Sequence, residues 1–333
     1  MPDGTSRFST LEGEVIYHFM GCSTFSEYTV LNAISLAKIN PAADPYQACL
    51  LGCGVSTGWG CVMNNPNFKA GVSVAVWGLG AVGLAVIQAA KLRGATRIYG
   101  LDINKGKFEI AKKFGATDCH NPMESSSKEW LLEHEKWGIE FTFDCTGNVM
   151  VMREALEVAH RGYGESTVVG VAAAGKELAT RPFQLVTGRV WKGTAFGGWK
   201  SRQDVPKLTN KVLLNEYPIK DYITHNFTGL EKVQELLDAL HSGDCLRGVL
   251  RISDWDVPSA DNIPKVIKSS KLFGGVLKTV QHFSQANQCV MTFSIFLPED
   301  DVHRQRTDAW PALYYLSGIF RNHETAVFES GVA

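Results

Sequence analysis

Three glycines spaced as Gly-x-Gly-x-x-Gly could bring the backbone close to a phosphate-bearing ligand. They are Gly78, Gly80 and Gly83. In a dinucleotide-binding turn the first glycine allows a tight bend, the second lets the backbone approach a pyrophosphate, and the third lets a helix pack on a strand. The helix that follows would direct unpaired N–H groups and its positive dipole end at the phosphates. The motif predicts a dinucleotide site, with an unliganded glycine turn as the alternative.

The elements around the glycines favour the dinucleotide site over that alternative. A short apolar stretch rich in β-branched residues, Val72–Trp77, precedes them, and Leu84–Leu92 follows with apolar residues at helical spacing. A second apolar stretch, Arg97–Leu101, ends in Asp102, nineteen positions after Gly83. An acid there would accept hydrogen bonds from the adenosine ribose hydroxyls and repel a 2′-phosphate. We therefore predict a βαβ unit that binds NAD in preference to NADP.

The wider pattern predicts an α/β fold with a doubly wound parallel sheet of the Rossmann type. Strands and helices alternate in the expected order: strand 72–77, helix 82–93, strand 97–101, helix 105–114, strand 141–145, helix 149–160 and strand 166–171. Before this region we expect two short strands of a β-rich domain and a helix interrupted by glycines; these are Val15–Phe19, Phe25–Leu31 and Pro45–Asn64. After it we expect a helix over 230–242 and a strand over 248–252.

Composition limits the partners and the location of the chain. Of 333 residues 45% are hydrophobic and 20% are charged, with a net charge of −1, which gives no electrostatic case for nucleic acid or a membrane surface. No apolar run reaches the ~18 residues of a membrane span, and the first residues lack a signal peptide's apolar core. The eight cysteines form no CxxC pair and are typical of reduced thiols. We expect a cytoplasmic protein acting on a small molecule.

Four stretches in order carry a family resemblance that covers residues 1 to about 252. They are Phe19–Tyr28, Leu50–Gly60, Thr180–Arg189 and Trp191–Ser201. With the glycine turn they resemble the zinc-dependent medium-chain alcohol dehydrogenases, and most closely the class III type, the glutathione-dependent formaldehyde dehydrogenases. The resemblance implies oxidation of S-hydroxymethylglutathione by hydride transfer to NAD, a catalytic zinc, and a homodimer formed through the segment 181–252.

The resemblance also implies a role for individual residues. The catalytic zinc would be held in part by Cys53, and a carboxylate of the glutathione substrate by Arg161. The cofactor contacts divide into the adenosine ribose (Asp102 and Lys107), the pyrophosphate (Arg247, beside Gly78, Gly80 and Gly83) and the nicotinamide (Thr57, Val169, Gly170, Val171 and Phe196).

The zinc site departs from the family pattern. A catalytic zinc needs three protein ligands and one open position, so that it can lower the pKa of the bound alcohol. In the family the other cysteine and histidine ligands, a four-cysteine structural zinc loop and a proton relay precede the point that matches Met1. No other cysteine and histidine in the sequence have the spacing of a pair of zinc ligands. We therefore expect that Cys53, by itself, does not hold a catalytic zinc. The expectation is NAD binding with little or no turnover. A non-catalytic NAD-binding interaction protein and a fragment of a longer enzyme are the alternatives.

The C-terminal part carries a second resemblance. Three stretches, Lys271–Gly275, Cys289–Pro298 and Pro311–Gly318, are similar to the start of S-formylglutathione hydrolase, an α/β-hydrolase. They suggest a fragment of a bifunctional fusion whose nucleophile elbow would follow Ala333. Gly54–Gly58 also fits the GxSxG esterase pattern, but an elbow must follow a buried strand, so we do not expect Ser56 to be a nucleophile.

These observations divide the chain into five predicted segments. They are a remnant of a β-rich GroES-like catalytic domain over 1–54, the NAD-binding domain over 55–197, a return to the catalytic and dimer region over 198–253, a linker over 254–270, and a partial esterase-like segment over 271–333 that we expect to be loosely packed or disordered.

Overall fold

The computed structural model describes residues 4–26, 29, 31–40, 42–252, 265–272, 275–284, 289–298 and 314–315. The chain forms two compact units, each described here by itself. One comprises residues 1–36, 226–238 and 250–333, and the other comprises residues 37–225 and 239–249. The chain passes from one unit to the other several times. The predicted segment boundaries at 54, 197 and 253 therefore stay predictions.

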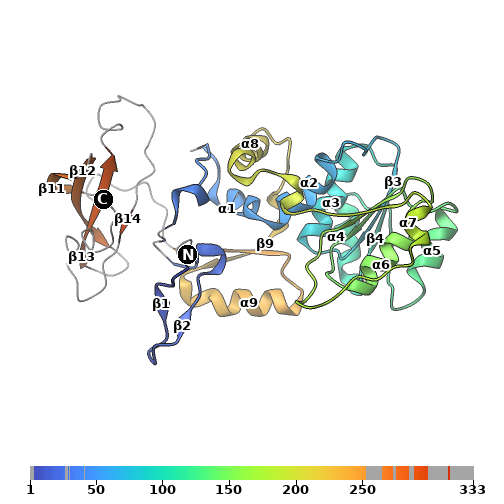
Figure 1. The fold of residues 1–333 in the computed structure, drawn as a ribbon, viewed down its shortest axis with the longest axis horizontal. Helices are drawn as coiled ribbons and strands as arrows, with labels where there is room; N and C mark the ends of the chain where they lie inside the picture. The colour runs from blue at the N-terminus through green and yellow to red at the C-terminus, as the bar shows by residue number, and fades with distance from the viewer. Residues whose placement is uncertain are drawn as a thin grey trace. The chain divides into compact units, whose positions relative to one another are not determined.

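The larger unit contains a six-stranded parallel sheet (Figure 1), which confirms the predicted doubly wound fold. Its strand order is β5 (Asp118–His120), β4 (Arg97–Leu101), β3 (Ser73–Trp77), β6 (Phe141–Asp144), β7 (Glu165–Val168) and β8 (Val190–Gly193). The order reverses between β3 and β6. In open α/β sheets a ligand binds at such a switch point, outside the carboxyl ends of the strands.

The central strand β3 is buried along its whole length, as expected for a parallel strand covered on both faces. Its last residue, Trp77, pairs with Leu101 of β4 on one side and with Asp144 of β6 on the other. Asp144 in turn pairs with Val168 of β7. The carboxyl ends of four strands are therefore level, and the loops that follow them share one edge of the sheet.

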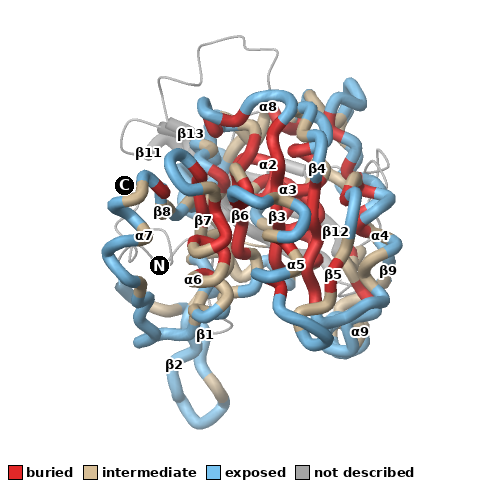
Figure 2. Tube along the Cα trace, turned by 90° about the vertical axis from the view of Figure 1, so that its right-hand side faces the viewer, coloured by how far each residue is buried: buried red, intermediate tan, exposed pale blue. Residues whose placement is uncertain are grey.

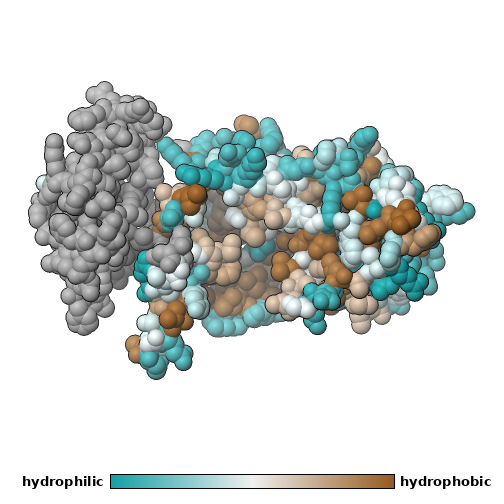
Figure 3. Space-filling view, viewed as in Figure 1, coloured by the Kyte–Doolittle hydropathy of each residue, from teal (hydrophilic) through white to brown (hydrophobic). Residues whose placement is uncertain are grey.

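Helices cover both faces of this sheet, and the buried residues concentrate on the central strands and on α2 and α3 (Figure 2). The helices of the larger unit are α1 (Pro45–Ala48), α2 (Gly54–Met63), α3 (Ala81–Leu92), α4 (Phe108–Phe114), α5 (Ser127–His134), α6 (Val149–Val158), α7 (Phe183–Val186) and α8 (Ser201–Leu213). Polar residues and separate apolar patches share the face drawn in Figure 3. Among the described residues, no helix has the length and apolar character needed to cross a lipid bilayer.

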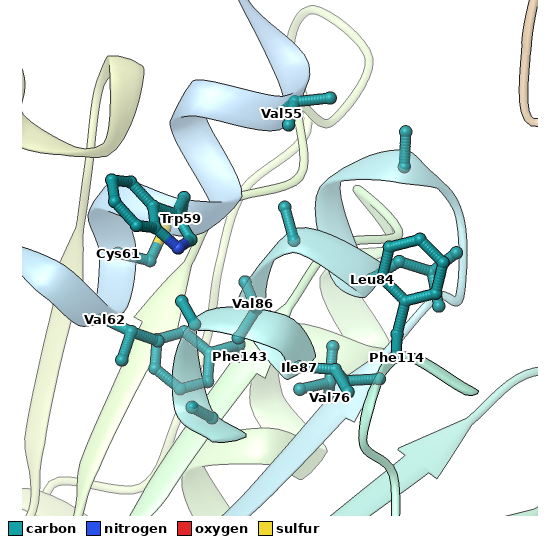
Figure 4. Packing of buried hydrophobic residues seen from close by; sticks show 14 of the residues in the cluster. Val55, Trp59, Cys61, Val62, Val76, Leu84, Val86, Ile87, Phe114 and Phe143 are labelled. Carbon is teal, nitrogen blue, oxygen red and sulfur yellow. The ribbon is translucent and has the colours of Figure 1, made fainter. Parts of the chain in front are cut away.

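The larger hydrophobic core joins α2 and α3 to the sheet (Figure 4). Trp59 and Val62 of α2 and Val86 and Ile87 of α3 are fully or almost fully buried there, together with Phe143 of β6. A smaller core on the opposite face of the sheet includes residues of α5 and α6. The helix that begins at the glycine turn is thus fixed on the sheet by extensive apolar burial, which is the main favourable term in folding.

The helix expected over Pro45–Asn64 is interrupted near Gly52 and Gly54, as the sequence suggested, but not at Gly58 and Gly60. The chain forms α1, then a 3₁₀ turn over Cys49–Gly52, then an uninterrupted α2 that contains Gly58 and Gly60. A Cβ atom at Gly58 would lie 2.1 Å from the Val82 carbonyl oxygen, and one at Gly60 would lie 2.4 Å from the Gly197 carbonyl oxygen. These glycines let backbones approach closely, so the prediction of a broken helix is wrong for α2.

The smaller unit contains short strands near the N-terminus and a separate antiparallel sheet. The N-terminal pair is β1 (Phe8–Ser9) and β2 (Val15–Ile16), shorter than the strand Val15–Phe19 that we expected. The four-stranded sheet consists of β11 (Lys265–Leu272), β12 (Gly275–Ser284), β13 (Cys289–Pro298) and β14 (Tyr314–Tyr315). This ladder lies in the region for which we expected loose packing, and β11 begins inside the predicted linker 254–270.

The remaining expected elements near the two ends of the dehydrogenase-like region have mixed outcomes. The predicted strand Phe25–Leu31 falls partly on residues 27, 28 and 30, which lie outside the described residues, and its described residues are not in a strand. The predicted helix over 230–242 corresponds to a 3₁₀ turn over Leu230–Lys232 followed by α9 (Val233–Ser242). The predicted strand over 248–252 is β10 (Arg247–Arg251), which pairs with β9 (Ile223–Thr228).

Candidate functional site

Each glycine of the turn between β3 and α3 has a distinct geometric reason. Gly78 has a φ of +88°, a backbone conformation that residues other than glycine rarely adopt. A Cβ at Gly83 would lie 1.9 Å from the carbonyl oxygen of Gly78, so only glycine lets α3 pack on the turn. A Cβ at Gly80 would meet no atom within 4 Å. Gly80 is the N-cap residue of α3 and faces open space, which leaves room for a ligand at the N-terminus of this helix.

Asp102 lies beside this turn, at the end of β4, and its carboxylate is buried and hydrogen-bonded. One oxygen accepts a hydrogen bond from the Leu79 backbone N–H at 2.8 Å, and the other accepts one from the Asn104 N–H at 2.8 Å. The Lys107 ammonium lies 3.3 Å from the first of these oxygens. The structure thus brings together the two residues expected at the adenosine ribose, and the Leu79 contact ties them to the glycine turn.

Arg247 reaches the same place from a distant part of the sequence. Its Nη2 atom lies 2.2 Å from the position that a Cβ at Gly54 would take, and Val82 Cγ2 lies 3.4 Å from that position. Gly54 is the first residue of α2 and Val82 lies in the first turn of α3. A guanidinium beside the first turn of α3 is well placed to bind phosphate oxygens, because Arg forms charge-assisted hydrogen bonds with them.

The loops after β6 and β7 meet at the same edge of the sheet. The Val169 and Gly170 N–H groups both donate to the Asp144 carbonyl oxygen at 2.9 Å. A Cβ at Gly78 would lie 3.1 Å from the Cys145 carbonyl oxygen, so the glycine turn contacts the loop after β6. Val171, the last residue of the predicted nicotinamide segment, is 92% exposed and therefore accessible to a ligand.

The backbone at Thr57 lies close to the backbone beside Phe196. A Cβ at Gly197, the neighbour of Phe196, would lie 2.5 Å from the Thr57 carbonyl oxygen. Phe196 has a positive φ of 52°, in the region rarely used by residues other than glycine. The Thr57 hydroxyl donates to the Cys53 carbonyl oxygen at 2.9 Å. Strained backbone of this kind is found at functional sites, and the role of this segment at the nicotinamide stays a prediction.

Cys53 is exposed at the start of α2, but the surrounding donors do not fit a catalytic zinc. Within the described ranges no group of three or more His, Cys, Asp or Glu side chains could hold a metal ion. Burial raises the pKa of the nearby Cys61 thiol to about 12, and it also raises the pKa of Cys145. A catalytic zinc needs three protein ligands, so the described residues do not supply such a site.

Two other residues from the sequence analysis, Arg161 and Ser56, take no part in the arrangement described above. Arg161 stands before β7, whereas the cofactor loops follow the carboxyl ends of the strands. The structure therefore does not bring Arg161 together with the other predicted residues. Ser56 is completely buried and its hydroxyl donates to the Leu51 carbonyl oxygen at 2.9 Å. A buried hydroxyl used in this way is not an exposed nucleophile, which agrees with our rejection of the esterase pattern.

Sequence reasoning missed one residue at this edge, Asp144. The sequence predicts it only as part of the strand 141–145, although a strand that ends in Asp and continues Cys-Thr-Gly offers a signal. A carboxylate at the end of a strand can accept hydrogen bonds from the N–H groups of the turn that follows. In the structure its carboxylate accepts such bonds from Thr146 and Gly147.

The strand order, the glycine turn and the acid after β4 define a dinucleotide-binding domain of the dehydrogenase type. A family model described as zinc-binding dehydrogenase matches residues 81–213. Among solved structures, an alcohol dehydrogenase zinc-binding domain protein from Burkholderia ambifaria has a TM-score of 0.67 at 26% identity, covering 75% of this chain and 68% of that one. Benzyl alcohol dehydrogenase from Acinetobacter calcoaceticus shares the fold, with a TM-score of 0.67 at 24% identity over 74% of this chain and 68% of its own.

Two curated relatives define the family more closely. The S-(hydroxymethyl)glutathione dehydrogenase of Photobacterium damsela subsp. piscicida is 54% identical over 252 residues, which are 75% of this chain and 68% of that protein. The alcohol dehydrogenase class-3 of Caenorhabditis elegans is 54% identical over 256 residues, which are 75% of this chain and 66% of that protein. The chain belongs to the class III alcohol dehydrogenase family. It spans about two thirds of the length of these relatives.

Proposed function

We propose that this chain binds NAD at the carboxyl edge of its parallel sheet. The observation that carries the proposal is the open space over Gly80 at the start of α3, with Asp102 beside the same turn and the Arg247 guanidinium beside Val82. These groups complement a ribose and a pyrophosphate, and they come from three separate segments of the chain. An unliganded glycine turn would not require a positive side chain and a buried acid next to the same helix end.

Each residue then has a task in holding the cofactor. Asp102 accepts hydrogen bonds from the ribose hydroxyls and disfavours a 2′-phosphate, and Lys107 lies beside its carboxylate. Arg247 and the first turn of α3 bind the pyrophosphate. The nicotinamide lies against Val169–Val171, with Phe196 and Thr57 nearby. When bound, NAD supplies the acceptor for a hydride.

The reaction we propose for the parent enzyme is that named for its relatives, the oxidation of S-(hydroxymethyl)glutathione with hydride transfer to NAD. The substrate is thus a small glutathione adduct, and the location is the cytoplasm. Because the described residues form no group of three side chains that could hold a metal ion, we expect this chain to bind NAD while turning over little or no substrate. A catalytic zinc would supply the Lewis acid for the parent reaction.

Calorimetric titration with NAD and NADP, together with a spectrophotometric assay of NADH formation from S-(hydroxymethyl)glutathione, tests this proposal. We expect NAD to bind with one site per chain, NADP to bind more weakly, and NADH formation to be at background with or without added zinc. Absence of NAD binding would refute the cofactor site. Zinc-dependent turnover by this chain would show that it forms a metal site the described residues do not supply.

A dimer is the proposed assembly. β8 is the end strand of the six-stranded sheet, and the short helix α7 that precedes it exposes 69% of Phe183 and 77% of Val186. An uncovered sheet edge beside exposed apolar side chains favours pairing with another chain. Sedimentation velocity should give a species of twice the chain mass, and Val186→Asp should shift it to the monomer. If the chain lacks turnover, such a dimer would act as an NAD-binding interaction protein.

A bifunctional fusion is the second candidate function. The strands β11–β14 lie across the stretches that resemble the start of S-formylglutathione hydrolase. Consecutive enzymes joined in one chain would raise the effective concentration of the shared intermediate. Hydrolysis of S-formylglutathione by the protein isolated from its source would support this reading, and hydrolysis at the uncatalysed rate would contradict it.

A further inference from the structure

A buried acid stands at the switch point of the sheet. Asp144 ends β6, and only 1% of it is exposed. Its Oδ1 atom accepts hydrogen bonds from the Thr146 N–H at 3.1 Å and from the Thr146 hydroxyl at 2.6 Å, and its Oδ2 atom accepts one from the Gly147 N–H at 3.2 Å. A buried carboxylate is costly unless it is satisfied in this way.

The same residue fixes the next loop through its backbone. The Asp144 carbonyl oxygen accepts from both Val169 and Gly170 at 2.9 Å. The two loops also touch directly, since a Cβ at Gly170 would lie 2.1 Å from the Gly147 nitrogen and 2.8 Å from Asp144 Oδ2. A Cβ at Gly147 would lie 2.4 Å from the Val171 carbonyl oxygen. Asp144 therefore sets the conformation of the turn against which Val169–Val171 rest.

We infer that Asp144 is a positioning residue for the nicotinamide half of the cofactor. It holds the turn Cys145–Gly147, and through it the segment Val169–Val171, in the conformation that receives the nicotinamide. The inference rests on the proposed function, because it assumes that Val169–Val171 contact this part of NAD. The adenosine half is bound by other loops, through Asp102 and Arg247, and does not depend on Asp144.

This division predicts a selective loss of affinity. Asp144→Asn keeps the size of the side chain but replaces one acceptor oxygen with an amide group, which cannot accept from the turn. Because the turn loses a hydrogen bond that holds its conformation, we expect NADH to bind about tenfold more weakly. ADP-ribose lacks the nicotinamide, and its affinity should stay within about twofold of the wild-type value.

Calorimetric titration of the full chain with NADH and with ADP-ribose measures both effects. Thr146→Val removes one donor, keeps the carboxylate and should produce a smaller selective loss of NADH affinity. Glu165→Gln is the matched control, because Glu165 is also buried, accepts a hydrogen bond from Asn65 at 2.9 Å and starts β7 at the other edge of the sheet. It should leave the ratio of the two affinities unchanged.

The outcomes separate this inference from the proposal on which it rests. A selective loss of NADH affinity in both Asp144→Asn and Thr146→Val, with an unchanged ratio in Glu165→Gln, supports the positioning role. An equal loss for both ligands, or no loss for either, overturns it and assigns Asp144 a purely structural role. If the wild-type chain binds neither ADP-ribose nor NADH, the proposed cofactor site itself is overturned.

Discussion

Two glycines three positions apart should respond in opposite ways to the same substitution. Gly80 faces open space, whereas a Cβ at Gly83 would lie 1.9 Å from the Gly78 carbonyl oxygen. Gly80→Ala should therefore weaken cofactor binding and leave stability nearly unchanged. Gly83→Ala should destabilise the fold. Each variant is the control for the other, since both add one methyl group to the same turn.

The expected stability changes follow from the local geometry. Gly80 has a φ of −80°, which alanine adopts without strain. The loss of unfolded-state freedom stabilises by about 0.4–1 kcal/mol, and the poorer helix cap offsets most of this. At Gly83 overpacking costs about 1–3 kcal/mol, and the gain in helix propensity recovers about 1 kcal/mol. Because the obstructing atom belongs to the backbone, we expect a net loss of about 1–2 kcal/mol.

Affinity should change in the opposite order. A methyl group on Gly80 occupies the space in which the pyrophosphate would approach the first turn of α3. Loss of one hydrogen bond to a charged group costs about 1.5–3 kcal/mol, or about tenfold or more in the dissociation constant. Gly83→Ala molecules that remain folded should bind NAD with an affinity closer to that of the wild type.

Thermal unfolding followed by circular dichroism and calorimetric titration with NAD measure the two effects. For a unit of about 200 residues, 1 kcal/mol corresponds to about 2–4 °C in the midpoint. Gly83→Ala should lower the midpoint by several degrees, and Gly80→Ala should leave it within about 2 °C. Wild-type NAD affinity in Gly80→Ala would refute the assignment of the open space to the phosphates. An unchanged midpoint in Gly83→Ala would refute the close-packing argument.

Three further predictions concern charge and titration. Arg247→Gln should weaken NAD binding about tenfold, and the remaining affinity should depend less on salt in calorimetric titrations at two ionic strengths. Burial raises the pKa of Glu165, but hydrogen bonds from Lys192 and two asparagines outweigh it and hold this pKa below the ordinary value of 4.5. The resulting stabilisation is present above pH 4.5 and is lost as the pH falls through the folded-state pKa, so urea unfolding should show a weaker acid dependence in Glu165→Gln. Mass mapping after brief alkylation should find Cys53 modified and Cys61 unmodified, because burial raises the pKa of Cys61 to about 12; modification of Cys61 first would contradict its burial.

The parts of the fold that could be predicted are those set by local patterns. The strand Arg97–Leu101 has the predicted bounds, and α3 begins and ends one residue before the predicted ones. Both follow from short runs of apolar residues with clear boundaries, an acid in one case and glycines in the other. The three glycines and Asp102 could be assigned for the same reason, since their spacing within one βαβ unit is itself the signal.

The parts that could not be predicted depend on contacts between distant segments. Gly58 and Gly60 suggested a broken helix, because their purpose is visible only when α3 and Gly197 lie against them. The pyrophosphate role of Arg247 is implied only by the family resemblance, because nothing in its local sequence indicates that it approaches Gly54. Asp144 was passed over because its function lies in the hydrogen bonds of the two loops that it joins.

Cofactor binding and metal binding make different demands on this chain. The proposed NAD site uses helix and turn N–H groups, one acid and one arginine, all held within one compact unit by glycine contacts and by apolar burial. A catalytic zinc instead needs three side chains converging to about 2 Å from one point, and Cys53 has no partners for this among the described residues. We therefore expect affinity for the dinucleotide to require no metal. It follows that NAD affinity should be the same in the presence of zinc and of a chelator, and a chelator-sensitive NAD affinity would show that the two sites are coupled in this chain.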